Sequence, residues 1–156
     1  MIKKIYLHWT AGRYDQLFDD YHICVDGGGG VHFMGDFNEK KAHTWQRNTD
    51  AIGIALCCAY GACIYEGEVC WGAYPPTDAQ INALAKIVAL LCRVFNLDME
   101  KDVLTHAEVA TIDGYGIGSG DPETKWDLLY LPKRKGKGGE YIRSLASAKL
   151  EDIEKR

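Results

Sequence analysis

Residues 51–58, AIGIALCC, form a continuous apolar run with the length of one strand. Such a run is typical of a strand that is covered on both faces, because a strand with one wet face alternates apolar and polar side chains. The next strong pattern begins at Thr77, which can cap a helix, with Gln80 completing a capping box. Apolar residues then recur at spacings of three and four up to Phe95. Strand and helix together predict an α/β fold.

Residues 4–10, KIYLHWT, are rich in β-branched and aromatic side chains and precede Ala11-Gly12, which predicts a strand followed by a loop. No internal repeat or linker interrupts the chain, so we expect residues 1–156 to form a single domain. The same reasoning assigns the remaining segments: a glycine-connected hairpin of short strands at 21–25 and 31–34, a short apolar approach at 103–106, a glycine-rich loop at 107–120 and a closing helix at 141–155.

The composition excludes several classes of protein. Hydrophobic residues make up 47% and charged residues 26% of the 156 residues, which argues against a disordered tail, a collagen-like fibre and a coiled coil. No apolar run approaches the roughly 20 residues that span a bilayer, and the opening residues do not have the pattern of an export signal. A net charge of −4 does not suit a nucleic-acid-binding protein. The basic run at 133–139 has two interpretations, a solvated loop or a docking patch for an anionic polymer.

The six cysteines do not form the paired Cys-x-x-Cys pattern of a structural zinc ribbon. Cys63 and Cys70 flank a turn-like segment and are candidates for a disulfide in an oxidising compartment, an alternative that the sequence leaves open. The other four lie in apolar stretches and are expected to be buried thiols: Cys24, Cys57, Cys58 and Cys92.

Three residues suggest a metal site. His8 ends the first predicted strand, His106 ends another apolar stretch, and Asp121 precedes Pro122 after a glycine-rich loop. Strand ends at one edge of a sheet are where α/β proteins gather functional side chains. Two imidazoles and a carboxylate suit a zinc ion with its fourth position open to water. The alternative, from spacing alone, is that these are ordinary hydrogen-bonded or exposed residues.

Five short motifs lie in order along the chain: residues 8–12 HWTAG, 21–26 YHICVD, 48–56 NTDAIGIAL, 105–110 THAEVA and 121–122 DP. Together they resemble the motifs of the type 2 N-acetylmuramoyl-L-alanine amidases. This family includes phage lysozymes of the amidase type, bacterial anhydromuramyl-peptide amidases and animal peptidoglycan recognition proteins. The resemblance covers roughly residues 5–131.

The resemblance implies a central mixed sheet flanked by helices and a bound Zn²⁺ ion. His8, His106 and Asp121 fall on the metal ligands, and Tyr21 falls on a tyrosine that activates the zinc-bound water or stabilises the oxyanion. Many members carry a lysine two residues before the third ligand, where counting from Asp121 gives Ser119, a neutral donor. The substrate groove is expected to include Trp9, His43, Trp45 and Asn48, with buried core as the alternative for the two tryptophans.

The implied activity is zinc-dependent hydrolysis of the amide between N-acetylmuramic acid and L-alanine in peptidoglycan, by a phage or prophage endolysin. Such a protein is expected to be a monomer that is made in the cytoplasm and acts on the bacterial cell wall, with peptidoglycan as its partner. A secreted effector and a recycling enzyme also fit this pattern. The main alternative is a module of the same fold that binds muropeptide without cutting it, and a more distant one is an amide hydrolase with another substrate.

Overall fold

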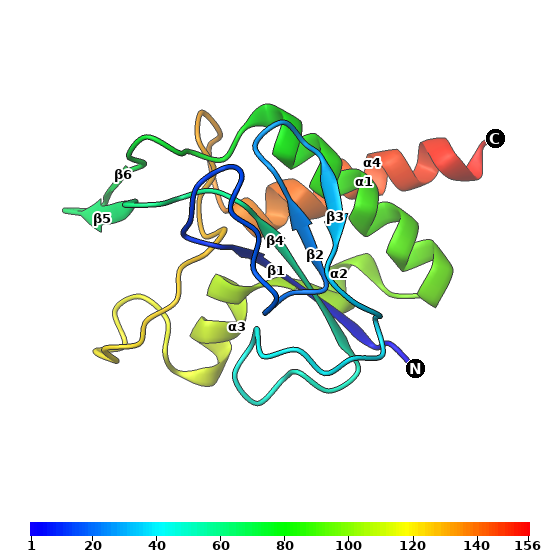
Figure 1. Ribbon diagram of the computed structural model, residues 1–156, viewed down its shortest axis with the longest axis horizontal. Helices are drawn as coiled ribbons and strands as arrows, with labels where there is room; N and C mark the ends of the chain where they lie inside the picture. Colours follow the sequence, from blue (N-terminus) through cyan, green and yellow to red (C-terminus); the bar gives the residue numbers. More distant parts are fainter.

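The computed structural model describes residues 1–156 and contains a five-stranded mixed sheet in the order β3-β2-β4-β1-β7 (Figure 1). The strands are β1 (Lys4–Trp9), β2 (Ile23–Val25), β3 (Val31–Phe33), β4 (Ala51–Leu56) and β7 (Val103–Thr105). β1 is parallel to β4 and β7, β4 is also parallel to β2, and only the β2–β3 pair is antiparallel. The predicted mixed sheet is confirmed.

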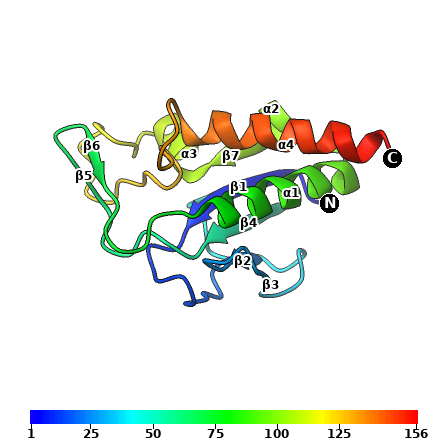
Figure 2. The same cartoon turned by 90° about the horizontal axis from the view of Figure 1, so that it is seen from above.

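Two long helices pack side by side over the sheet (Figure 2). α1 (Asp78–Phe95) contacts β2 and β4, whereas α4 (Gly138–Glu154) contacts β7. Every residue of β4 is buried, as its uninterrupted apolar sequence predicts. The predicted capping box of α1 is present, because the Thr77 hydroxyl accepts a bond from the Gln80 amide and the Gln80 side chain accepts one from the Thr77 amide. None of the helices has the length and apolarity needed to cross a bilayer.

A further helix, α3 (His106–Asp113), occupies part of the segment that the sequence predicts as a loop, and for these residues the prediction is wrong. The helix begins with its own capping box, in which Thr105 and Glu108 exchange side-chain to backbone hydrogen bonds. The four glycines of the segment all follow the helix, and Gly114 ends it with a φ of 88°. The glycine-rich pattern therefore indicates a loop only for the second half of the segment. A short helix, α2 (Met99–Asp102), precedes β7.

A separate two-stranded hairpin protrudes from the body of the protein (Figure 1). It consists of β5 (Cys63–Tyr65) and β6 (Glu68–Cys70). Cys63 and Cys70 face each other across the hairpin as exposed free thiols, so their pairing in an oxidising compartment stays a prediction. The other four cysteines are buried, as predicted.

Candidate active site

The topology of the sheet explains how two histidines that are far apart in the sequence meet. His8 is the second-last residue of β1, and His106 follows the last residue of β7 directly. The two strands are parallel neighbours with Leu7 opposite Thr105. Because the carboxyl ends of parallel strands lie at one edge of a sheet, both imidazoles reach the same place.

A carboxylate completes a compact cluster of three buried side chains with the two histidines. His8 Nδ1 lies 3.1 Å from His106 Nδ1 and 3.1 Å from Asp127 Oδ2, and His106 Nδ1 lies 3.2 Å from the same oxygen. The backbone supports this arrangement, since the Ala107 amide donates a hydrogen bond of 3.2 Å to the Asp127 carbonyl. Three potential ligand atoms therefore form a nearly equilateral triangle.

The acidic member of this triangle is Asp127, whereas the sequence predicts Asp121. Asp121 is exposed, and its carboxylate accepts a hydrogen bond of 2.8 Å from the Glu123 amide, which makes it part of a local turn. Asp121 thus contributes to the turn around Pro122, and its carboxylate is not part of the triangle. Asp127 stands between the apolar residues Trp126 and Leu128. A carboxylate in such a stretch has to find partners when it is buried, and that signal was available in the sequence.

The electrostatics of the triangle favour the protonation states that bind a cation. Burial alone would raise the pKa of Asp127, but the contacts of its carboxylate with His106 and His8 hold the pKa well below its ordinary value. Burial lowers the pKa of His8, and the nearby charges of His106 and Lys125 add to this effect, whereas Asp127 opposes it. An ionised carboxylate beside a neutral imidazole is the donor state that metal binding requires.

The donor set fits a zinc ion. Tetrahedral zinc with bonds of about 2.0–2.1 Å to nitrogen and oxygen places its ligand atoms about 3.3 Å apart, close to the 3.1–3.2 Å sides of this triangle. Two imidazole nitrogens and one carboxylate oxygen are also the ligand types of hydrolytic zinc sites that leave a position open. His8, His106 and Asp127 would hold such an ion.

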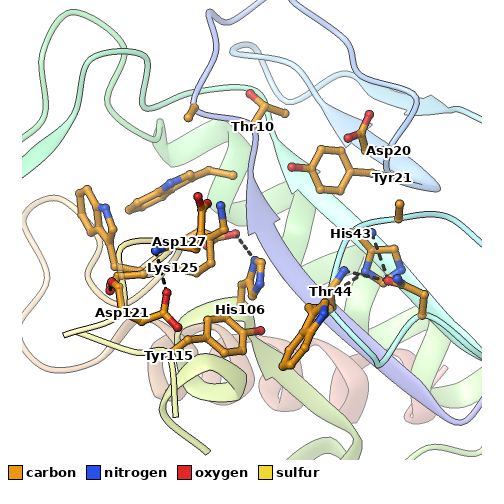
Figure 3. Close-up of a pocket in the computed structure, with 18 residues that line it drawn as sticks. Thr10, Asp20, Tyr21, His43, Thr44, His106, Tyr115, Asp121, Lys125 and Asp127 are labelled. Carbon is orange, nitrogen blue, oxygen red and sulfur yellow. Dashed lines mark hydrogen bonds and ion pairs between the residues drawn. The ribbon is translucent and has the colours of Figure 1, made fainter. Parts of the chain in front are cut away.

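Two members of the triangle, His106 and Asp127, line an open cleft of about 820 Å³, whereas His8 is buried beside them. In Figure 3, His106 and Asp127 lie on one side of the strand that crosses the view, and Tyr21, His43 and Thr44 lie on the other. Among the residues predicted for the site, His8 and Ser119 are outside the lining. The hydroxyl of Ser119 accepts a hydrogen bond of 3.2 Å from the Asp121 amide. The other predicted residues that line the cleft are Trp9, Trp45, Asn48 and Asp121.

The predicted groove residues differ in how they contribute to the cleft. Trp45 is 64% exposed at the rim, edge-on to Tyr115. Trp9 is buried, with its ring packed edge-on to Trp71 and Trp126. Asn48 is structural in this arrangement, because its Oδ1 accepts hydrogen bonds from two consecutive backbone amides of the loop that precedes it. Trp45 is therefore the aromatic side chain that is most accessible to a ligand.

Tyr21 lies beside the triangle, with its ring centroid 5.2 Å from that of His8. Burial, together with the negative charge of Asp127, raises the pKa of Tyr21 well above its ordinary value. The phenol therefore keeps its proton at neutral pH. A protonated phenol donates a hydrogen bond, so Tyr21 is a candidate hydrogen-bond donor rather than a base.

Two further side chains, Lys125 and Tyr115, line the cleft. Lys125 stands two positions before Asp127 and lines the same cleft. Tyr115 follows α3, and its ring lies edge-on to that of His106 with 6.1 Å between the centroids. Its hydroxyl is buried without a hydrogen-bond partner. Lys125 could have been found by counting back from Asp127, whereas no sequence signal marks Tyr115.

Fold and site define an α/β protein with a candidate metal centre at the strand ends of a mixed sheet, below an open cleft. The sequence model of the N-acetylmuramoyl-L-alanine amidase family matches residues 1–124, and the chain belongs to this family. The match ends three residues before Asp127. No curated protein matches the chain.

Solved structures of amidases and recognition proteins share the fold. The amidase AmiD from E. coli, in complex with anhydro-N-acetylmuramic acid-L-Ala-D-γ-Glu-L-Lys, gives a TM-score of 0.55 at 22% identity, over 68% of this chain and 48% of that chain. The Ph2119 endolysin from the Thermus scotoductus MAT2119 bacteriophage Ph2119 gives a TM-score of 0.52 at 20% identity, over 69% of this chain and 72% of that chain. Drosophila peptidoglycan recognition protein SD gives a TM-score of 0.52 at 14% identity, over 82% of this chain and 85% of that chain. The present chain thus spans about half the length of AmiD.

Proposed function

We propose that residues 1–156 form a zinc-dependent amidase domain that cleaves the bond between N-acetylmuramic acid and L-alanine in peptidoglycan. The observation that carries this proposal is the triangle of ligand atoms at 3.1–3.2 Å from His8, His106 and Asp127. Membership of the amidase family gives the reaction class. The likeness to an endolysin supports action on the bacterial wall as a phage or prophage enzyme. A single chain contains every group invoked, so we propose a monomer.

Each residue around the triangle has a distinct task in this proposal. A zinc ion, when bound, lowers the pKa of its water to about 7 and polarises the amide carbonyl. Asp127 keeps its negative charge and His8 stays neutral, so both present lone pairs to the cation. Tyr21, with its phenol protonated, donates a hydrogen bond to the oxygen on which charge develops. Trp45 provides an exposed aromatic face for the sugar or the stem peptide.

Lys125 takes the role that the sequence interpretation gave to Ser119. In the amidases that this chain resembles, a lysine stands two residues before the third ligand, and with Asp127 as that ligand the residue is Lys125. Its location in the cleft lining supports the assignment. A full positive charge close to the developing oxyanion stabilises it more than a neutral hydroxyl does.

The non-catalytic binding module remains the second candidate, because the fold is shared with peptidoglycan recognition protein SD. Its main support was the absence of a lysine before the third ligand, and Lys125 removes that support. Incubation of the zinc-loaded protein with purified sacculi separates the two. Release of new L-alanine amino termini supports the enzyme, and binding of sacculi without release supports the module.

A pair of aspartate variants tests the metal centre. We expect Asp127→Ala to lose the bound zinc, about one ion per chain in the wild type, together with the release of L-alanine termini. The matched control is Asp121→Ala, which removes a carboxylate of the same cleft and is expected to keep both. Elemental analysis of the purified proteins measures the zinc, and circular dichroism confirms the fold. Loss of zinc in Asp121→Ala with retention in Asp127→Ala would reverse our assignment.

A further inference from the structure

The hydroxyl of Thr44 connects the metal triangle to a third histidine. Thr44 is buried, and its Oγ1 lies 3.2 Å from His8 Nε2 and 2.8 Å from His43 Nδ1. His8 Nδ1 faces the triangle, so the hydroxyl is the neighbour of the ring nitrogen on the opposite side of the imidazole. We propose that Thr44 is a positioning residue that holds the proton of His8 on Nε2 and thereby leaves the Nδ1 lone pair free for the metal. This inference rests on the proposed zinc site.

The donors and acceptors of His8, Thr44 and His43 determine the direction of the hydrogen bonds that connect them. A hydroxyl has one hydrogen to donate and accepts through its lone pairs. When His8 carries its proton on Nε2, it donates to Thr44 Oγ1, and the hydroxyl hydrogen is directed to His43 Nδ1. In the opposite arrangement the hydroxyl donates to His8, whose proton then sits on Nδ1 and blocks the ligand atom. Metal-binding histidines generally donate their second ring nitrogen to an acceptor of this kind.

Backbone hydrogen bonds fix the position of Thr44 between the two histidines. The amides of His43 and Thr44 donate hydrogen bonds of 3.1 and 2.8 Å to Asn48 Oδ1, which fixes the loop that carries both side chains. Gly53 of β4 leaves space for the imidazole of His43, since a Cβ atom there would lie 2.5 Å from His43 Cγ. Nε2 of His43 is buried without a partner, so the chain of hydrogen bonds ends at this ring.

Three threonine variants test the proposal through zinc affinity, measured by competition with a chromophoric chelator. Thr44→Val removes the hydroxyl at nearly constant volume, and we expect zinc to bind about 10–100-fold more weakly. Thr44→Ser restores the hydroxyl and should bind zinc within about threefold of the wild type. Thr111→Val on α3 makes the same exchange at an exposed position and should have no effect. Wild-type affinity in folded Thr44→Val would overturn the proposal.

The tautomer of His8 gives a second measurement. Long-range proton–nitrogen NMR spectra of zinc-loaded wild-type protein should show the proton of His8 on Nε2, and a proton on Nδ1 would overturn the proposal. The metal-free protein separates this inference from the proposed function. If wild-type protein binds no zinc, the proposed function fails, whereas an Nε2-protonated His8 that becomes Nδ1-protonated in Thr44→Val still supports the positioning role of Thr44.

Discussion

Lys125 and Ser119 differ in their access to the site, although both lie in the segment between α3 and Asp127. Lys125 lines the cleft, and its charge contributes to the lowered pKa of His8. Ser119 is bonded to the Asp121 amide and does not line the cleft. The two side chains therefore offer a direct comparison between a cation at the site and a hydroxyl outside it.

We expect Lys125→Met to lower kcat on peptidoglycan by about 10²–10³-fold, because it removes charge stabilisation of the oxyanion. Zinc content should be unchanged, since no ligand atom is lost. Ser119→Ala is the control and should keep kcat within about twofold of the wild type, because its hydroxyl is not a transition-state donor. Steady-state release of L-alanine termini measures both variants. A large loss in Ser119→Ala with normal kcat in Lys125→Met would return the auxiliary role to the serine.

At this scale, much of the candidate site follows from the sequence. His8, His106 and Tyr21 stand in motifs whose strand context was clear, and the structure brings them together. The sequence did not identify the acidic member of the triangle, because Asp121 and Asp127 both follow the same loop and only burial distinguishes them. Thr44 carries no signal in the sequence, since its contact with His8 joins two segments through tertiary packing alone.

The element that delivers His106 is α3, and an ion pair with α4 holds its first turn. Arg143 donates hydrogen bonds of 2.7 and 2.8 Å to the two carboxylate oxygens of Glu108 and one of 3.2 Å to the Val103 carbonyl. Burial alone would raise the pKa of Glu108, but the bonds from Arg143 and Thr105 keep it below its ordinary value. The arginine thus connects β7, α3 and α4.

We expect Arg143→Met to lower the free energy of unfolding by about 2–3 kcal/mol, because Glu108 is left partly buried without its cation. The control is Lys149→Met on the same helix, which removes a cation that has no hydrogen bond or ion pair and should change the stability by less than about 0.5 kcal/mol. Urea unfolding of the metal-free proteins measures the difference. An equal loss in both variants would show that the effect comes from α4 itself rather than from the pair.

The helices show where sequence reasoning succeeds and where it fails. α1 is long, amphipathic and capped, so its periodicity was visible. α3 has only eight residues. Its buried residues cluster toward the start of the helix, so they do not form one apolar stripe along it. The capping box of Thr105 and Glu108 was the sequence signal for this helix, but the glycines that follow the helix favoured the prediction of a loop. Short elements held by tertiary contacts are the ones that the pattern misses.

Across the whole molecule, one surface ion pair connects the loop that carries His43 and Thr44 to the end of α3. Arg47 donates two hydrogen bonds of 2.7 Å to the carboxylate of Asp113. These bonds lower the pKa of Asp113 below its ordinary value, although partial burial opposes the shift. A carboxyl group whose pKa is lower in the folded state stabilises the fold above its unfolded pKa and loses this contribution as the pH falls through the folded value.

We therefore expect Arg47→Gln to destabilise the protein by about 1 kcal/mol at neutral pH. The difference from the wild type should shrink as the pH falls below about 4 and disappear once Asp113 is protonated in both states. Urea unfolding in the presence of a chelator, repeated across the acidic range, measures this dependence. Arg93→Gln on α1 provides the control, since Arg93 has no ion pair. A destabilisation by Arg47→Gln that stays constant with pH would rule out the ion pair as its cause.

The placement of the tryptophans gives the protein an intrinsic optical probe. Of the four in the chain, Trp9, Trp45 and Trp126 line the cleft, and Trp71 packs against two of them. No indole elsewhere contributes background fluorescence. Trp45 is mostly exposed, so we expect it to emit at long wavelength and to shift to the blue when a sugar or peptide covers it. Trp9 and Trp126 also line the cleft but are less exposed. Ligand entry can thus be followed in real time without a label.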